Sequence, residues 1–202
     1  MCIYHHKKTI FVHIPKTGGI FIRKALKLPN PTGVLDKDHV RPSFLGIKEY
    51  WEDYFTFTFV RNPYDRLVSS YFFDHLRSEQ GRNINEGNIR KEIVRFDKTP
   101  AGFGNFIKEF MPIDFNKNRK YISMSNILEN YSLDFIGKLE NLDEDIRKAY
   151  HLIHSRPIPK VPTKKQNTSP RKNYQFYYKD DKIKKMVYDY YYQDFIQFGY
   201  EE

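Results

Sequence analysis

Six consecutive residues near the N-terminus, the IPKTGG of residues 14–19, have the types needed to bind an anion. A run of β-branched and aromatic residues, 7–14, predicts a buried strand before them, and apolar residues at helical spacing follow. Glycines between a strand and a helix let successive backbone N–H groups turn toward a phosphate, and Lys16 adds a positive charge. A glycine pair can also serve only to allow a positive φ. The order differs from the GxxxxGK[ST] loop of ATP-hydrolysing enzymes, because Lys16 precedes the glycines.

Arg61 and Ser69 form a second candidate anion site within FVRNPYDRLVSSY, residues 59–71. Alternating Phe and Thr residues predict a strand over residues 54–60, and Arg61 follows at its carboxyl end, where open α/β sheets bind ligands. Ser69 lies eight residues later, on a helix predicted over residues 64–76. An arginine and a hydroxyl can bind one phosphate together. The alternatives are a surface ion pair for Arg61 and a satisfied helix hydroxyl for Ser69, but two such sites at consecutive strand ends favour an anionic ligand.

Strands that alternate with helices must position these residues. Beside the two strand–helix units just described, a third is predicted from a strand over residues 134–139 and a helix over residues 143–154. A last helix is predicted over residues 180–198, with an apolar stripe along it. This order predicts a single α/β domain, residues 1–202, with a central parallel β-sheet flanked by helices and a P-loop-like strand–loop–helix nucleotide site.

Two segments are less regular. Residues 78–119 hold a charged helix candidate over 88–95 and an amphipathic one over 100–111, and they are interpreted as an insertion that shapes an acceptor cleft, although packing alone also explains them. Residues 156–172 contain four prolines and several basic side chains. They predict a long basic loop, for which a function is expected.

Composition limits the class of protein. The length of 202 residues predicts one compact domain, and an aromatic content of 17% excludes a disordered chain. The formal charge of +9 favours a polyanionic partner, such as a nucleic acid, an anionic lipid, a nucleotide or an anionic glycan. One cysteine, Cys2, excludes an internal disulfide. Without an apolar run of the ~20 residues that span a membrane and without a signal peptide, the chain is expected to be cytoplasmic if Met1 is its native start.

The two anion motifs together resemble the sulfotransferases that use 3′-phosphoadenosine-5′-phosphosulfate (PAPS), particularly the carbohydrate branch with the heparan-sulfate 2-O and chondroitin enzymes. IPKTGG is similar to the 5′-phosphosulfate loop of that family, and FVRNPYDRLVSSYF is similar to its 3′-phosphate segment, with the spacing from arginine to serine kept. DFIGKLENLDEDI and the C-terminal YYQDFIQFGY are similar to segments that close the fold in the same branch. The resemblance covers residues 9–200, nearly the whole chain.

The resemblance implies a role for each matching residue. Lys16 would contact the bridging oxygen of the departing phosphosulfate, while Arg61 and Ser69 would bind the 3′-phosphate. Backbone donors to the 5′-phosphate would come from Thr17, Gly18 and Gly19, and the site extends to Ile20. At position 20 relatives usually carry Thr or Ser, so one side-chain oxygen is missing here. The basic loop would cover the nucleotide through Lys164, Lys165, Arg171 and Lys172.

A base must remove the proton of the acceptor hydroxyl, and histidine titrates in the right range. We expect His39 to be this base, because it lies between the two motifs and its HVxxSFL context is similar to the base segment of the 2-O branch. The alternative is a loop histidine without a role, with Asp36 and Asp38 as fallback bases. The other histidines considered are expected to face solvent or to pack, since no acid or thiol completes a metal site near them; these are His5, His6, His151 and His154.

These features and the resemblance predict a PAPS-dependent sulfotransferase that moves a sulfuryl group to an acceptor hydroxyl by in-line transfer. A carbohydrate is the favoured acceptor. Its partners would be the nucleotide donor and that acceptor, without a metal and without a nucleic acid. A nucleotide-dependent phosphotransferase is the first rival, but it would need an acidic magnesium ligand at a strand end. The second rival is a non-enzymatic module that binds nucleic acid or an anionic glycan, and the formal charge of +9 supports it.

Overall fold

The computed structural model describes residues 2–29, 48–81, 89, 92–129, 131–160 and 170–202. The chain divides into two compact units, each built from two stretches of sequence. The first unit comprises residues 1–61 and 124–167, and the second comprises residues 62–123 and 168–202. The boundary falls directly after Arg61. The motif of residues 14–19 and Arg61 therefore belong to the first unit, whereas residues 62–71 of the second motif belong to the second unit.

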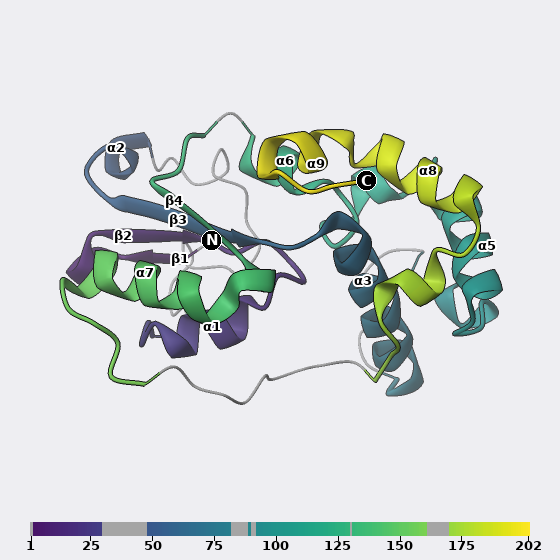
Figure 1. The fold of residues 1–202 in the computed structure, drawn as a ribbon, viewed down its shortest axis with the longest axis horizontal. Coiled ribbons are helices and arrows are strands. Elements are labelled where there is room, and N and C mark those ends of the chain that lie inside the picture. The colour runs from purple at the N-terminus through teal and green to yellow at the C-terminus, as the bar shows by residue number, and fades with distance from the viewer. Residues whose placement is uncertain (1, 30–47, 82–88, 90–91, 130, 161–169) are drawn as a thin grey trace. The chain divides into compact units, whose positions relative to one another are not determined.

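A four-stranded sheet forms the centre of the first unit within the described residues (Figure 1). The strands lie in the order β1-β2-β3-β4. Their bounds are Cys2–Tyr4, Thr9–Val12, Phe55–Val60 and Phe135–Lys138. β2, β3 and β4 run parallel, with Val12 opposite Thr58 and Val60 opposite Lys138. The α/β class and the three parallel strands are confirmed.

β1 corrects the expectation of a purely parallel sheet. It pairs antiparallel with β2, and Cys2 lies opposite Phe11. The connection between the two strands is the single 3-10 turn η1, His5–Lys7, followed by Lys8 in the left-handed conformation. A connection this short can join only antiparallel strands, since a parallel pair needs a crossover of a dozen residues or more. Cys2 is fully buried in this edge strand.

Helices α1 (Gly19–Ala25) and α7 (Leu142–His154) lie together on one side of this sheet (Figure 1). Their apolar faces pack with the sheet in one core, to which Phe11, Phe57 and Ile146 belong. The acidic first turn of α7 does not cap its own helix: Asp145 accepts a hydrogen bond from the backbone N–H of Lys138 at 2.7 Å. This bond ties the helix to the end of β4. The unit also contains α2 (Lys48–Trp51), α6 (Met124–Leu128) and the 3-10 turn η5 (Leu139–Asn141).

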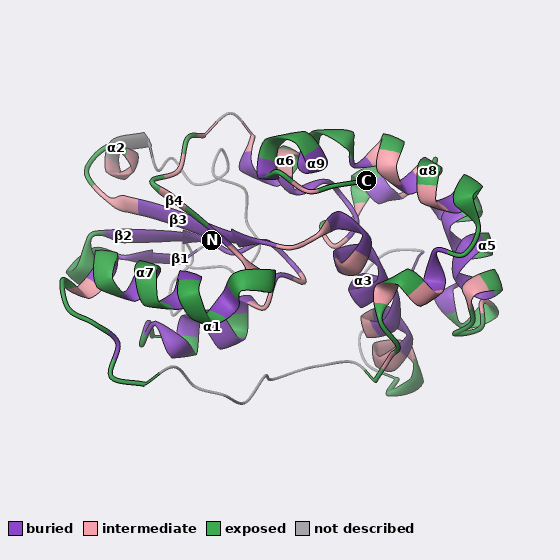
Figure 2. Cartoon of the chain, in the orientation of Figure 1, coloured by how far each residue is buried: buried purple, intermediate pink, exposed green. Residues whose placement is uncertain are grey.

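The second unit is helical and has an aromatic core. Its principal helices are α3 (Pro63–Glu79), α5 (Pro100–Phe110), α8 (Asp181–Tyr190) and α9 (Tyr192–Phe198), with the 3-10 turns η3 (Ile93–Arg95), η4 (Phe115–Lys117) and η6 (Tyr174–Tyr177). Figure 2 shows buried and exposed residues alternating along α5 and α8, whereas α3 is buried or intermediate along nearly all of its length. The Tyr71 ring of α3 lies 5.2 Å from that of Phe103 and 5.0 Å from that of Phe106 on α5. Asn62 caps α3 and Thr99 caps α5, each through its side-chain oxygen.

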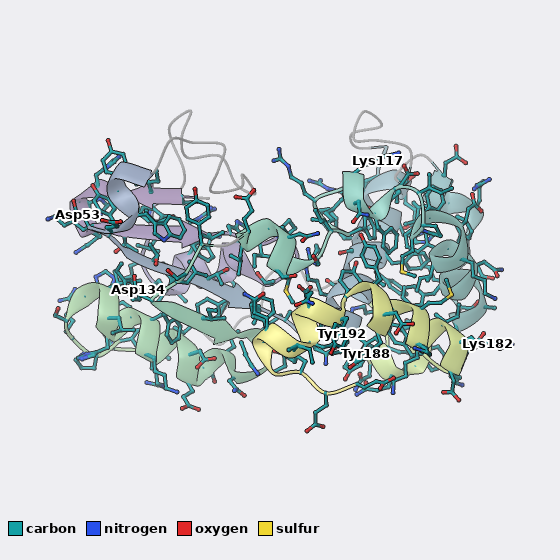
Figure 3. The ribbon with its side chains drawn as sticks, turned by 90° about the horizontal axis from the view of Figure 1, so that it is seen from above. Asp53, Lys117, Asp134, Lys182, Tyr188 and Tyr192 are labelled. Atoms are coloured by element: carbon teal, nitrogen blue, oxygen red, sulfur yellow. The ribbon has the colours of Figure 1, made fainter. Side chains whose placement is uncertain are left out.

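One continuous helix over residues 180–198 is wrong, because the chain breaks into α8 and α9 at Tyr191. The backbone there leaves the helical region, with φ −99° and ψ 17°, and the buried Tyr191 hydroxyl donates to the Tyr121 carbonyl. Tyr188 and Tyr192 flank the break, with ring centroids 5.8 Å apart (Figure 3). The buried stripe itself is confirmed, since Ile183, Val187 and Phe195 are all buried.

The other predicted elements are confirmed where they are described. The helix expected over residues 64–76 is α3 and extends three residues further, and the strands and helices near residues 54–60, 100–111, 134–139 and 143–154 are β3, α5, β4 and α7. Of the helix candidate over residues 88–95, residues 88, 90 and 91 lie outside the described residues, and the described end is the 3-10 turn η3. In the part of the chain that is described, no helix is both long and apolar enough to cross a membrane.

Candidate anion-binding site at the carboxyl ends of β2 and β3

The loop between β2 and α1 has a strained but well-anchored backbone. Lys16 has φ +71° and Gly18 has φ +81°, so two residues in three adopt the left-handed conformation. For a residue with a side chain this conformation costs about 1–2 kcal/mol, whereas glycine adopts it freely. Thr17, fully buried between them, donates its hydroxyl proton to the Ile14 carbonyl at 2.9 Å. The strand–turn–helix unit that the sequence predicted is present.

A positive φ at Gly18 and a close contact at Gly19 explain why these two positions are glycines. A Cβ atom on Gly18 would lie 2.9 Å from Leu139, which follows β4. A Cβ atom on Gly19 would lie 2.0 Å from the imidazole of His13. His13 is buried, and its ring is stacked on Phe11 at 5.4 Å. Sequence reasoning did not single out His13 or Leu139, although His13 directly precedes the motif.

This backbone leaves donors available for a ligand. Among the described residues, the N–H groups of Thr17, Gly18 and Gly19 have no hydrogen-bond acceptor. Successive N–H groups around a left-handed residue form a concavity suited to an anion. Ile20, the next residue, begins the exposed side of α1 with 40% of its surface accessible. The arrangement fits an anionic group such as a phosphate.

Arg61 reaches this loop from the neighbouring strand. Because β2 and β3 are parallel, their carboxyl ends meet at one edge of the sheet, and Arg61 directly follows Val60 there. Its Nη1 atom donates to the Lys16 carbonyl at 3.0 Å. The sequence placed Arg61 at a strand end but did not predict a bond to the other motif. Both cationic residues thus lie at the same edge of the first unit.

Ser69 belongs to the second unit, where it lies on α3 with 8% of its surface accessible. The residues beside it anchor an irregular segment of the same unit. Arg66 donates to the Ile122 carbonyl at 2.8 Å, and Ser70 donates to the Lys120 carbonyl at 3.0 Å. These two side chains, four residues apart, share one face of the helix. They hold the segment against α3, which fixes the helix that carries Ser69.

Asp74 completes this buried network one helical turn further along α3. It is fully buried and accepts hydrogen bonds from the Tyr121 hydroxyl at 2.8 Å and from the Lys120 ammonium. Burial, together with the charge of Asp74, raises the pKa of Tyr121 well above its ordinary value. The tyrosine therefore remains a neutral donor. The sequence marks this network only by the i, i+4, i+8 spacing of Arg66, Ser70 and Asp74.

The remaining predicted residues divide into two groups. Arg171 forms an ion pair with Asp65 in the second unit, and the Lys172 ammonium lies 4.2 Å from the centre of the Phe176 ring. The others lie outside the described residues: Asp36, Asp38, His39, Lys164 and Lys165.

Two of the histidines expected to face solvent or to pack have hydrogen-bond partners. A ring nitrogen of His5 is hydrogen-bonded to the Tyr54 hydroxyl at 2.8 Å, and one of His154 to the Leu26 carbonyl at 2.9 Å. Over the residues that are placed, no group of His, Cys, Asp and Glu side chains could hold a metal ion.

Comparison with known proteins gives consistent results. The profile of the sulfotransferase family matches residues 1–201. Carbohydrate sulfotransferase 8 of Mus musculus is 26% identical over 181 residues, which are 78% of this chain and 42% of that protein. Carbohydrate sulfotransferase 9 of Homo sapiens is 29% identical over 176 residues, which are 77% of this chain and 39% of that protein. This chain spans about two fifths of the length of these two relatives.

A third relative is similar over most of its own length. An uncharacterized protein of Archaeoglobus fulgidus is 30% identical over 130 residues, which are 63% of this chain and 88% of that protein. No solved structure matches the chain.

Proposed function

Because the chain belongs to the sulfotransferase family, we propose that it moves a sulfuryl group from PAPS to a hydroxyl of a carbohydrate acceptor. The loop of residues 14–19 carries the proposal. It presents backbone N–H groups and Lys16 at the carboxyl end of β2, beside Arg61 at the end of β3. The names of the two carbohydrate sulfotransferases support a carbohydrate acceptor.

Each part of the donor has proposed partners. The N–H groups of Thr17, Gly18 and Gly19 bind the 5′-phosphate, and Ile20 borders it. Lys16 stabilises the charge that develops on the bridging oxygen as that oxygen leaves, because a cation fixed in place before the reaction favours the transition state over the ground state. The 3′-phosphate is assigned to Arg61 and Ser69, as the family resemblance implies.

The acceptor side of the proposal rests on His39. In the transfer, the acceptor oxygen forms a bond to sulfur while the bond from sulfur to the 5′-phosphate oxygen breaks, and the acceptor proton passes to His39. Asp36 and Asp38 are the other candidate bases nearby in sequence. The basic side chains of Lys164, Lys165 and Arg171 are assigned to the nucleotide as a covering loop. Arg171 must then exchange or share its partner Asp65.

Retention on immobilised 3′,5′-ADP tests the proposal. We expect the protein to bind this matrix and to be released by PAPS but not by ATP, because only PAPS carries the 3′-phosphate. Release by ATP and magnesium would support a phosphotransferase. Retention on heparin or DNA, without retention on 3′,5′-ADP, would support a binding module and contradict the proposal.

A further inference from the structure

The hydrogen bond between Arg61 and Lys16 joins the 5′-phosphate loop to a residue assigned to the 3′-phosphate, and both residues belong to the first unit. Arg61 stands at the end of β3, and its Nη1 atom lies 3.0 Å from the Lys16 carbonyl oxygen. That carbonyl belongs to the peptide between Lys16 and Thr17. We infer that Arg61 is a positioning residue for the 5′-phosphate loop, besides any contact of its own with the 3′-phosphate. This inference rests on the proposed function, since it concerns the same donor.

Peptide geometry explains how one bond can orient the loop. The peptide unit is planar and trans, so the C=O of Lys16 and the N–H of Thr17 point in opposite directions. A guanidinium that holds the carbonyl therefore also fixes the direction of the Thr17 N–H. This N–H is one of the donors assigned to the 5′-phosphate. Without Arg61 the plane could rotate and turn the donor away.

The strain at Lys16 favours relaxation of the loop unless contacts prevent it. Its φ of +71° is one that residues with side chains rarely adopt, and such outliers persist only where surrounding contacts determine them. Two hydrogen bonds restrain the loop here. The Thr17 hydroxyl donates to the Ile14 carbonyl, and the Arg61 guanidinium donates to the carbonyl of Lys16 itself. The first joins residues three apart, whereas the second ties the loop to the neighbouring strand. Arg61 thus holds Lys16 in the conformation in which its ammonium meets the leaving oxygen.

Calorimetry with two nucleotides tests the inference. 5′-ADP lacks the 3′-phosphate, so its affinity reports on the loop alone. We expect Arg61→Ala to weaken 5′-ADP binding by about five- to tenfold and 3′,5′-ADP binding by more. Ser69→Ala is the matched comparison: it removes an assigned 3′-phosphate contact, so it should weaken 3′,5′-ADP and not 5′-ADP. Unchanged 5′-ADP binding in a folded Arg61→Ala variant would overturn the inference.

A second measurement separates the strain from the phosphate contact. Lys16→Ala and Lys16→Gly both remove the ammonium, but only glycine adopts φ +71° without strain. Arg61→Ala should then be added to each variant. The loss of 3′,5′-ADP affinity that it causes should be at least threefold smaller in the Lys16→Gly background than in the Lys16→Ala background. Equal losses would show that Arg61 does not stabilise the loop. If Arg61→Ala does not fold, Arg61→Met, which keeps the apolar stem without the donors, replaces it in both experiments.

The inference and the proposed function fail in different ways. If the unmodified protein does not bind 3′,5′-ADP at all, the assignment of the donor is wrong. If it binds and Arg61→Ala affects only ligands with a 3′-phosphate, the donor is right and the positioning role is wrong.

Discussion

Replacing Gly19 by alanine adds one carbon atom at the tightest point of the candidate site. The new Cβ would lie 2.0 Å from two atoms of the His13 ring, where ordinary contacts are about 3.4–4 Å. The ring would have to withdraw by about 1.5 Å. It cannot do so easily, because it is stacked on Phe11, which in turn is stacked on Phe57 at 4.7 Å, and both phenylalanines are fully buried.

Overpacking of this kind costs about 1–3 kcal/mol, and the stacked rings place Gly19→Ala at the upper end, at about 3 kcal/mol. Backbone strain adds nothing, since positive φ is recorded at Gly18 and not at Gly19. With an m value of about 2 kcal/mol/M, the urea midpoint followed by circular dichroism should fall by about 1.5 M. Gly19→Ala should also weaken 3′,5′-ADP, because the N–H of residue 19 moves with its Cα.

The matched control is Gly19→Ala in a His13→Ala background. Removing the ring makes room for the new methyl group, so there the second substitution should cost nothing or stabilise the helix by up to about 1 kcal/mol. The two substitutions should thus be strongly non-additive. A loss of 3 kcal/mol in both backgrounds, or no loss in either, would refute the steric explanation.

Three further predictions concern the reaction and pH. Lys16→Ala should keep its fold, judged by circular dichroism, and lose sulfuryl transfer by about a hundredfold or more; near-normal turnover would contradict its role. His39→Ala should reduce turnover by ~10²–10⁴ with little change in 3′,5′-ADP affinity. If His39→Ala turns over normally and Asp36→Ala or Asp38→Ala does not, the base is an aspartate. Burial, assisted by the charge of Lys98, lowers the pKa of His75 from 6.5. Near and below pH 6.5 the unfolded chain therefore binds more protons than the folded one. The free energy of unfolding should fall as the pH drops from 7 to 5. Urea titrations of His75→Phe, compared with the unmodified protein, should show a smaller fall; an equal fall would assign the pH dependence to other groups.

Local signals made the first unit's loop predictable. The run before Pro15, the glycines after Lys16 and the apolar spacing behind them each reflect nearest-neighbour geometry, so the strand, turn and helix could be located from the residues. The same holds for Arg61, because alternating Phe and Thr residues end just before it. β1 could not be found in this way. Three residues are too few for a periodic pattern, and the strand depends on its pairing with β2.

The buried polar network of the second unit shows a different limit. Helical spacing places Arg66, Ser70 and Asp74 on one face, but charged side chains ordinarily indicate the exposed face of a helix. Here the face is buried, because backbone carbonyls of residues 119–122 and the Tyr121 hydroxyl lie against it. Those partners are about 50 residues away in sequence, and no local pattern connects them. The break at Tyr191 has the same origin, since its partner is also Tyr121.

The position of Cys2 provides a natural probe of how the sheet opens. It is the chain's one cysteine, it is fully buried, and it lies on β1, which among the described strands pairs with β2 alone. A thiol reagent such as Ellman's reagent can therefore modify the native protein only after β1 has separated. The rate of colour development, divided by the rate for the unfolded chain, gives the free energy of that separation when closing is faster than modification. Repeating the measurement with saturating 3′,5′-ADP then reports whether fraying of this edge disturbs the loop that follows β2, without any introduced label.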